Sequence, residues 1–145
     1  MNEIEFHFNV SDKLAYSCRL LRKAHASGAC IAVTAEPGLL AELDALLWCF
    51  SPAGFVPHCT EAAPAATLAA TPIVLTAAPA SAPHHDVLLN LGPSVPLGFE
   101  GFRRFIEVVS TSPEDMHAGR RRWKHYAAGG YALKRHDLAK AGSAA

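Results

Sequence analysis

Short apolar segments alternate with segments of helical periodicity along most of this chain, and this alternation limits the possible folds more than any other feature. Residues 3–10 alternate between apolar and polar side chains, which is the period of a strand with one buried face. Residues 29–35 form a continuous apolar run, typical of a strand covered on both faces. Strands that alternate with helices predict an α/β fold, with a mainly parallel sheet and helices on both faces.

The other predicted elements follow from local start and stop signals. Ser11 is the predicted N-cap of a helix that Gly28 stops, and Ser112 with Pro113 starts a last helix that runs to Gly129. The remaining expected elements are a helix from Leu39 to near Trp48, an extended segment at 55–58, and strands at 73–75, 86–91 and 105–109. Residues 61–82, rich in Ala, Pro and Thr, are expected to form the most flexible surface.

The length of 145 residues corresponds to one ordinary domain, and half of the residues are hydrophobic, which is enough for a core. We expect this domain to cover residues 1–137 and residues 138–145 to form a disordered tail. No apolar stretch is long enough to cross a bilayer, and the acidic N-terminal residues do not resemble a signal peptide. The sequence therefore predicts a cytoplasmic protein.

Charge is unevenly distributed, although the formal net charge is zero. Residues 1–102 contain four Lys or Arg and nine Asp or Glu, whereas residues 103–145 contain nine Lys or Arg and four Asp or Glu. A basic C-terminal third favours an acidic partner for that end of the chain. A solvated helix face without a partner is the alternative interpretation.

Motifs for cofactor binding and catalysis are missing from the sequence. It contains neither a P-loop nor a G-x-G-x-x-G turn after the first predicted strand, so we expect no nucleotide cofactor. The four cysteines form no C-x-x-C pair, and His84 and His85 are adjacent residues that cannot easily face one ion, so we expect no metal. Cys49 or Cys59 beside His58 lacks a recognisable nucleophile turn, so we expect no thiol-based catalysis.

A basic segment in the last predicted helix, residues 120–126, is the first candidate binding site. Helical periodicity places Met116 and Trp123 on one stripe, with Arg120 and Lys124 one turn apart beside it. An apolar slot flanked by two cations suits a peptide that ends in an aromatic side chain and a free carboxylate. The same pattern is compatible with binding of nucleic-acid phosphates, or with a core stripe that has a solvated basic border.

An aromatic segment around Trp48 and Phe55 is the second candidate site. The loop between them, residues 49–54, contains no charged residue. Large aromatic side chains often dominate the energetics of protein interfaces. Closure of the core by these rings is the alternative interpretation.

The order and spacing of these segments resemble those of the chi subunit family of bacterial DNA polymerase III. The matching segments are 4–8, 46–48, 55–58, 72–75, 85–91, 105–109 and 120–126, with Gly130 and Tyr131 following. Two positions depart from the family pattern: Trp123 stands where a relative has tyrosine, and Met116 stands at a position that is basic in that relative.

The resemblance implies a Rossmann-like α/β fold without known catalytic activity and with two protein partners. One is the psi subunit, which tethers chi to the clamp loader, and the other is the acidic tail of single-stranded-DNA-binding protein, which ends in phenylalanine. By matching positions, the psi-facing residues are Trp48, Phe55, Val56 and Pro57. The residues implied for the tail site are Val109, Arg120, Trp123 and Lys124.

The resulting hypothesis is a non-catalytic replisome adaptor that links the clamp loader to protein-coated single-stranded DNA. Two alternatives belong to other classes: a protein that binds nucleic acid directly through the basic helix, and an enzyme on a degenerate nucleotide-binding fold. Salt-dependent affinity for a naked oligonucleotide would favour the first. Stabilisation by a nucleotide or a metal would favour the second.

Overall fold

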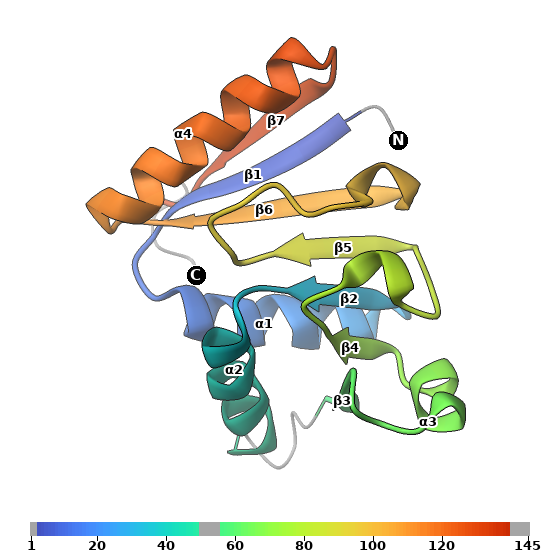
Figure 1. The fold of residues 1–145 in the computed structure, drawn as a ribbon. Coiled ribbons are helices and arrows are strands. Elements are labelled where there is room, and N and C mark those ends of the chain that lie inside the picture. The colour runs from blue at the N-terminus through green and yellow to red at the C-terminus, as the bar shows by residue number, and fades with distance from the viewer. Residues whose placement is uncertain (1–2, 50–55, 140–145) are drawn as a thin grey trace.

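Seven parallel strands form one sheet in the computed structural model, which describes residues 3–49 and 56–139 (Figure 1). The strand order is β3-β4-β2-β5-β6-β1-β7, and all six strand pairings are parallel. The strands are β1 (Glu3–Val10), β2 (Ile31–Thr34), β3 (His58–Thr60), β4 (Ile73–Leu75), β5 (Val87–Asn90), β6 (Arg104–Ser110) and β7 (Ala132–Asp137). The α/β fold with a parallel sheet is thereby confirmed.

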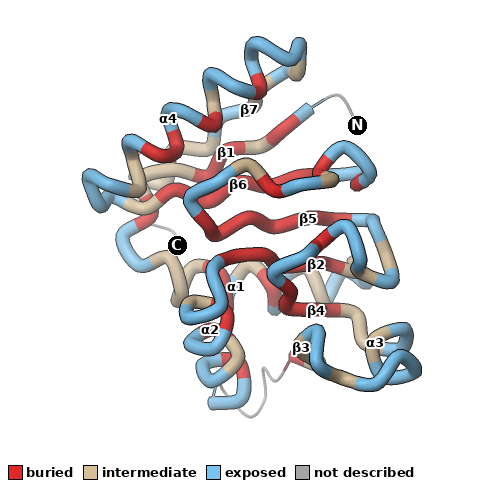
Figure 2. The backbone as a smooth tube through the Cα atoms, viewed as in Figure 1, coloured by how far each residue is buried: buried red, intermediate tan, exposed pale blue. Residues whose placement is uncertain are grey.

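Helices cover both faces of the sheet. They are α1 (Lys13–Ala26), α2 (Pro37–Cys49), α3 (Ala65–Ala70) and α4 (Pro113–Ala128), and two short 3-10 helices, η2 (Pro79–Ser81) and η3 (Phe99–Gly101), lie in the loops. Alternate residues of β6 separate two cores: Ile106 and Val108 pack with α1 and α2, whereas Phe105 and Val109 pack with α4. The central strands are accordingly the most buried part of the backbone (Figure 2). Within the described residues, no helix is long and apolar enough to span a membrane.

The end of β1 departs from the predicted alternation. Asn9 has a left-handed backbone with φ of 61°, and the pairing register between β1 and β6 shifts between His7 and Val10. This irregularity turns Val10 to the α1 and α2 side, while Phe6 stays on the α4 side. The alternation in the sequence predicts that Ile4, Phe6, Phe8 and Val10 share one face, and this prediction was wrong for Val10, because a bulge reverses the alternation.

Three local expectations need adjustment. The N-cap of α1 is Asp12, whose carboxylate accepts a hydrogen bond from Ala15 N at 3.0 Å, and not Ser11. The short strand or extended segment expected at 55–58 overlaps the observed strand only at His58, since β3 runs from His58 to Thr60 and pairs with β4. Residues 61–82 contain α3 and η2 besides the predicted strand at 73–75.

Strand β7 was not predicted, because residues 132–137 read as a polar segment after the last helix. The sequence Ala-Leu-Lys-Arg-His-Asp has no regular apolar alternation. An edge strand of this kind is paired on one side only, and charged side chains are frequent on such edges. Leu138 continues the ordered chain and donates a backbone hydrogen bond to Phe8 O at 3.0 Å. Residues 140–145 of the predicted tail lie outside the described residues.

Candidate binding pocket on helix α4

Helix α4 begins where the sequence predicts, at Pro113 after Ser112, and ends at Ala128 before Gly129. Its first turn is fixed to the rest of the molecule by Asp115. The Asp115 carboxylate accepts a hydrogen bond from Ser110 N at 2.6 Å and pairs with Lys13 Nζ at 2.9 Å. Burial opposes ionisation of Asp115, but these bonds outweigh it and hold the pKa of the carboxyl below its usual value.

The middle of α4 approaches β6 closely because residue 119 is glycine. A Cβ atom at Gly119 would lie 2.9 Å from Val109 Cγ2, which is closer than carbon atoms tolerate. Because glycine has no side chain, the backbone of α4 can pack directly against the Val109 side chain. The close approach defines one wall of the pocket described below.

A buried polar network fixes the rotation of α4 over the sheet. The Arg122 side chain, 2% exposed, donates from Nε to Glu107 Oε1 at 3.0 Å and from Nη1 to Pro93 O at 3.0 Å. Tyr126 donates its hydroxyl to Glu107 Oε2, and Asn90 Nδ2 donates to the same carboxylate at 3.0 Å. Burial and the Glu107 charge raise the pKa of Tyr126 well above its usual value, so the hydroxyl stays a donor.

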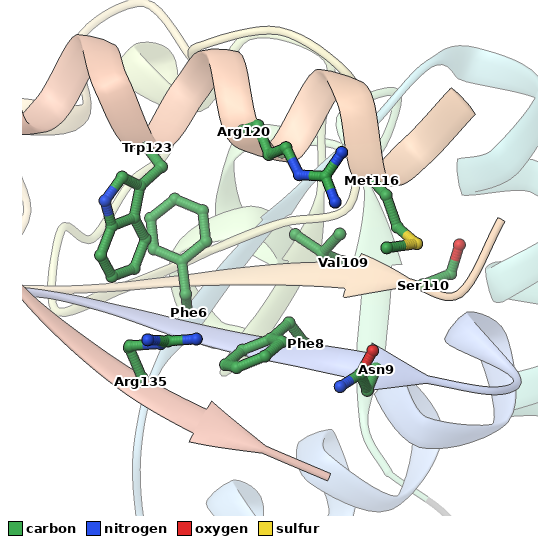
Figure 3. Close-up of a pocket in the computed structure, with 10 residues that line it drawn as sticks. Phe6, Phe8, Asn9, Val109, Ser110, Met116, Arg120, Trp123 and Arg135 are labelled. Atoms are coloured by element: carbon green, nitrogen blue, oxygen red, sulfur yellow. The ribbon is translucent and has the colours of Figure 1, made fainter. Parts of the chain in front are cut away.

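A pocket of about 460 Å³ lies between α4 and the strands β1, β6 and β7 (Figure 3). Its lining residues are Phe6, Phe8, Asn9, Val109, Ser110, Met116, Gly119, Arg120, Trp123 and Arg135. The aromatic part is ordered by ring contacts, since Phe6 and Trp123 meet edge to face with ring centroids 5.0 Å apart. The pocket therefore has a preformed apolar interior.

Two guanidinium groups border this interior from opposite sides. Arg120 points from α4 toward the hollow, and Arg135 reaches it from β7 (Figure 3). The Arg135 guanidinium carbon lies 5.1 Å from the centroid of the Phe8 ring and 5.9 Å from that of Trp123. This position over aromatic faces holds the cation in place by cation–π attraction. An apolar hollow with two arginines at its border can bind a ligand that has an apolar group next to a negatively charged one.

The structure brings together three of the four residues expected here. Val109, Arg120 and Trp123 line the pocket, whereas Lys124 is exposed and is not among the lining residues. The second cation is Arg135, which the sequence analysis missed because β7 was not recognised as a strand. Its place follows from the register, since Arg135 pairs directly with Phe6. The sequence did contain a signal for this position. Leu133 packs in the α4 core, so Arg135, two residues later on the same strand, lies on the same face of the sheet.

The aromatic segment at the end of α2 is partly on the surface. Trp48 is 61% exposed, and the centroid of its ring lies 5.1 Å from the ring centroid of His58. Pro57 is half-buried, whereas Val56 is 1% exposed and belongs to the core between the sheet and α2. His58 is held by Asp44, with Nε2 3.1 Å from Oδ1, and by Val56 O, 2.7 Å from Nδ1. Phe55 lies outside the described residues.

A second hollow of about 530 Å³ lies at the carboxyl ends of β2, β4 and β5, where α/β folds often bind nucleotides. Among the described residues that line it, Glu36 is the one charged side chain. The Asn90 side chain there already forms hydrogen bonds: Oδ1 accepts from Gly92 N, and Nδ2 donates to Ser94 O and to the Glu107 carboxylate. A phosphate group would meet an anion in this hollow and no cation from its lining.

Comparison with known proteins agrees with the resemblance of the sequence. The sequence model of the family described as DNA polymerase III chi subunit, HolC, matches residues 1–134. DNA polymerase III subunit chi of Pseudomonas aeruginosa is 30% identical to this chain over 143 residues, which cover 95% of this chain and 98% of that relative. The chain therefore belongs to the DNA polymerase III chi subunit family, a family of accessory subunits in DNA replication.

Proposed function

We propose that this protein is a non-catalytic adaptor of the bacterial cytoplasm, linking the DNA polymerase III clamp loader to the acidic C-terminal tail of single-stranded-DNA-binding protein. The observation that carries the proposal is the pocket of α4, with its aromatic interior and its two arginines. Membership of an accessory-subunit family supports a role in assembly of the replication machinery. The adaptor needs no cofactor of its own for this role.

The chemistry of the pocket matches a peptide that ends in phenylalanine. The apolar surface of Phe6, Phe8 and Trp123 can receive the terminal aromatic ring. Arg120 and Arg135 can pair with the terminal carboxylate, and each charge-assisted hydrogen bond contributes about 1.5–3 kcal/mol. Acidic residues upstream of the terminal phenylalanine would meet the exposed Lys124 and Arg121, outside the pocket.

The clamp-loader side is proposed at the end of α2, through the psi subunit. The exposed Trp48 ring supports this assignment, together with Leu46, which is also exposed. Pro57 is proposed to extend the same surface, and the buried Val56 to support it from the core. Phe55, outside the described residues, is kept as a psi-binding residue on the family resemblance alone. Because α2 and α4 lie on opposite faces of the sheet, both partners can bind one copy of the protein at once (Figure 1).

Direct binding of nucleic acid is the second candidate function, supported by the exposed cations of α4. Single-strand binders usually combine such cations with aromatic faces on which bases stack. The Trp123 ring is instead packed against Phe6 inside the pocket, which suits one inserted ring better than a row of stacked bases. The geometry therefore favours the peptide.

Titration with the C-terminal peptide of the host's own single-stranded-DNA-binding protein tests the proposal. We expect saturable one-to-one binding that changes the fluorescence of Trp123, measured in a Trp48→Phe background so that one tryptophan reports. A peptide with an amidated C-terminus should bind about tenfold more weakly or worse, because it lacks the carboxylate. Replacement of the terminal phenylalanine by alanine should weaken binding by a similar factor.

Equal binding of the amidated and unmodified peptides would contradict the role given to the arginines. Tighter binding of an oligonucleotide than of the peptide at physiological salt would favour the second candidate function.

A further inference from the structure

Three side chains with metal-binding atoms meet on the face of β1 and β7 that is opposite the α4 pocket. Glu5 and His7 alternate with the pocket residues of β1, and His136 pairs directly with His7 across the two strands. Glu5 Oε1 lies 3.6 Å from His7 Nε2 and 3.5 Å from His136 Nε2. Each pair of potential ligand atoms in this group lies within 4.8 Å.

We propose that Glu5, His7 and His136 form a binding site for a divalent transition-metal ion, with Zn²⁺ as its occupant. The distances support a metal better than direct hydrogen bonding. Ordinary N–H···O bonds are about 2.7–3.2 Å long, so both nitrogen–oxygen distances are too long. Ligand atoms about 2.0–2.1 Å from a tetrahedral Zn²⁺ lie about 3.4 Å from one another, which is close to the observed separations.

The two histidine nitrogens that face Glu5 also lack other partners. His7 is 7% exposed, and its Nε2 has no hydrogen-bond partner among the described residues. The Nε2 atom of His136 is also buried and also has no hydrogen-bond partner among the described residues. Buried polar atoms without a partner are costly, and a coordinated cation would satisfy both nitrogens at once.

The surroundings orient two of the three ligands. The Tyr16 hydroxyl lies 2.5 Å from His7 Nδ1, so the remaining nitrogen, Nε2, is directed toward Glu5. Hydrogen bonds of this kind to the second ring nitrogen are usual around metal-bound histidines. Arg104 donates from Nε to Glu5 Oε2 at 2.6 Å and from Nη2 to Oε1 at 3.1 Å. Because each carboxylate oxygen has two lone pairs, Oε1 keeps one that can bind a metal.

The ligand types select among metals. Two imidazoles and one carboxylate suit Zn²⁺ and its neighbours in the first transition series, whereas Mg²⁺ and Ca²⁺ prefer oxygen ligands throughout. Three protein ligands leave one tetrahedral position for water. His136 is 40% exposed at its side chain, which leaves an access route for the ion.

Binding of the ion would connect the edge strand β7 to β1. Arg135, the neighbour of His136, reaches the α4 pocket from the other side of the same strand. A metal bound between His7 and His136 would fix the register that places Arg135 opposite Phe6. Stabilisation follows because the ion binds the folded chain and finds no preformed site in the unfolded chain.

Calorimetric titration of the metal-free, full-length protein with ZnCl₂ tests the proposal. We expect one ion per chain, and an affinity at least about a hundredfold lower for His136→Ala. Tyr16→Phe, which removes only the orienting hydroxyl, should lower the affinity about tenfold. His125→Ala is the matched control, because His125 is exposed on α4 and should leave Zn²⁺ binding unchanged.

Two further measurements distinguish loss of the metal ligand from a loss of folding, and the proposed site from a cysteine site. His136→Gln preserves the size of the side chain, and Zn²⁺ should raise the melting temperature of the unaltered protein but not that of this variant. Co²⁺ in place of Zn²⁺ should give the visible bands of a nitrogen and oxygen site. A strong thiolate-to-cobalt band would assign the ion to cysteines, and unchanged binding in both His136 variants would equally overturn the proposal.

Discussion

The two faces of the sheet hold their helices by different means. Helix α4 is fixed by a buried charge network, in which Arg122 and Tyr126 bind Glu107. Helix α2 contributes apolar side chains to the opposite core, with Leu43 and Leu47 fully buried. Hydrogen bonds between charged side chains fix the orientation of a helix on the sheet, whereas burial of apolar side chains is largely non-directional. A helix whose rotation is fixed in this way can carry a preformed pocket, whereas the end of α2 presents an exposed aromatic ring.

The largest effect should come from breaking the α4 network. Arg122→Ala leaves Glu107 without its cation in a site closed to water, and we expect the free energy of unfolding to fall by about 3–5 kcal/mol. Urea denaturation followed by circular dichroism measures this loss. Arg121→Ala is the matched control, because Arg121 is exposed on the same helix and should change stability by less than about 0.5 kcal/mol. Similar losses in both variants would contradict the network as the main support of α4.

The next effect should appear in binding and leave stability intact. Arg120→Ala should weaken binding of the tail peptide about tenfold or more, with an almost unchanged melting temperature, because Arg120 is exposed at the pocket border. Arg135→Ala should act similarly, since Arg135 also lines the pocket. Isothermal titration calorimetry measures both affinities.

Lys124→Ala distinguishes the pocket from the outer surface of α4. Lys124 lies outside the pocket, so its loss should weaken peptide binding less than the loss of Arg135. The reverse order would indicate that the peptide follows the outer surface of α4 and does not enter the pocket.

A smaller effect on the fold is expected on the α2 face. Trp48→Ala removes a mostly exposed ring, so the free energy of unfolding should change by about 1 kcal/mol or less. Binding to the clamp-loader side, assayed by co-purification with the psi subunit, should be lost, while affinity for the tail peptide stays the same. Unfolding of this variant would show that Trp48 is a core residue, and loss of both partners would show that the two faces are not independent.

The smallest effect should be seen with naked single-stranded DNA. We expect binding weaker than micromolar at physiological salt, because the pocket beside Trp123 and Phe6 suits one inserted ring better than a row of stacked bases. Fluorescence anisotropy of a labelled oligonucleotide measures this affinity over a range of salt concentrations. Submicromolar binding that Arg120→Ala abolishes would assign the basic face to nucleic acid.

Local patterns in the sequence determined most of the elements that build this fold. The apolar runs of β2, β5 and β6 and the start of α4 at Pro113 lie where the periodicity and the capping signals place them. Such signals depend on neighbouring residues in the chain, so they can be read without the rest of the molecule. The same holds for Trp123 and Arg120, which share one helix face because they are three residues apart.

Tertiary structure decided the features that depend on contacts between distant segments. Arg122 and Arg120 are both arginines in one basic run, but only Arg122 meets a carboxylate on β6, and it is therefore buried. Arg135 completes the pocket because β7 pairs with β1. This pairing cannot be predicted from the polar sequence of the edge strand alone. The approach of Glu5, His7 and His136 has the same origin, since His136 comes 129 residues after His7 in the sequence and meets it only through the pairing of β7 with β1.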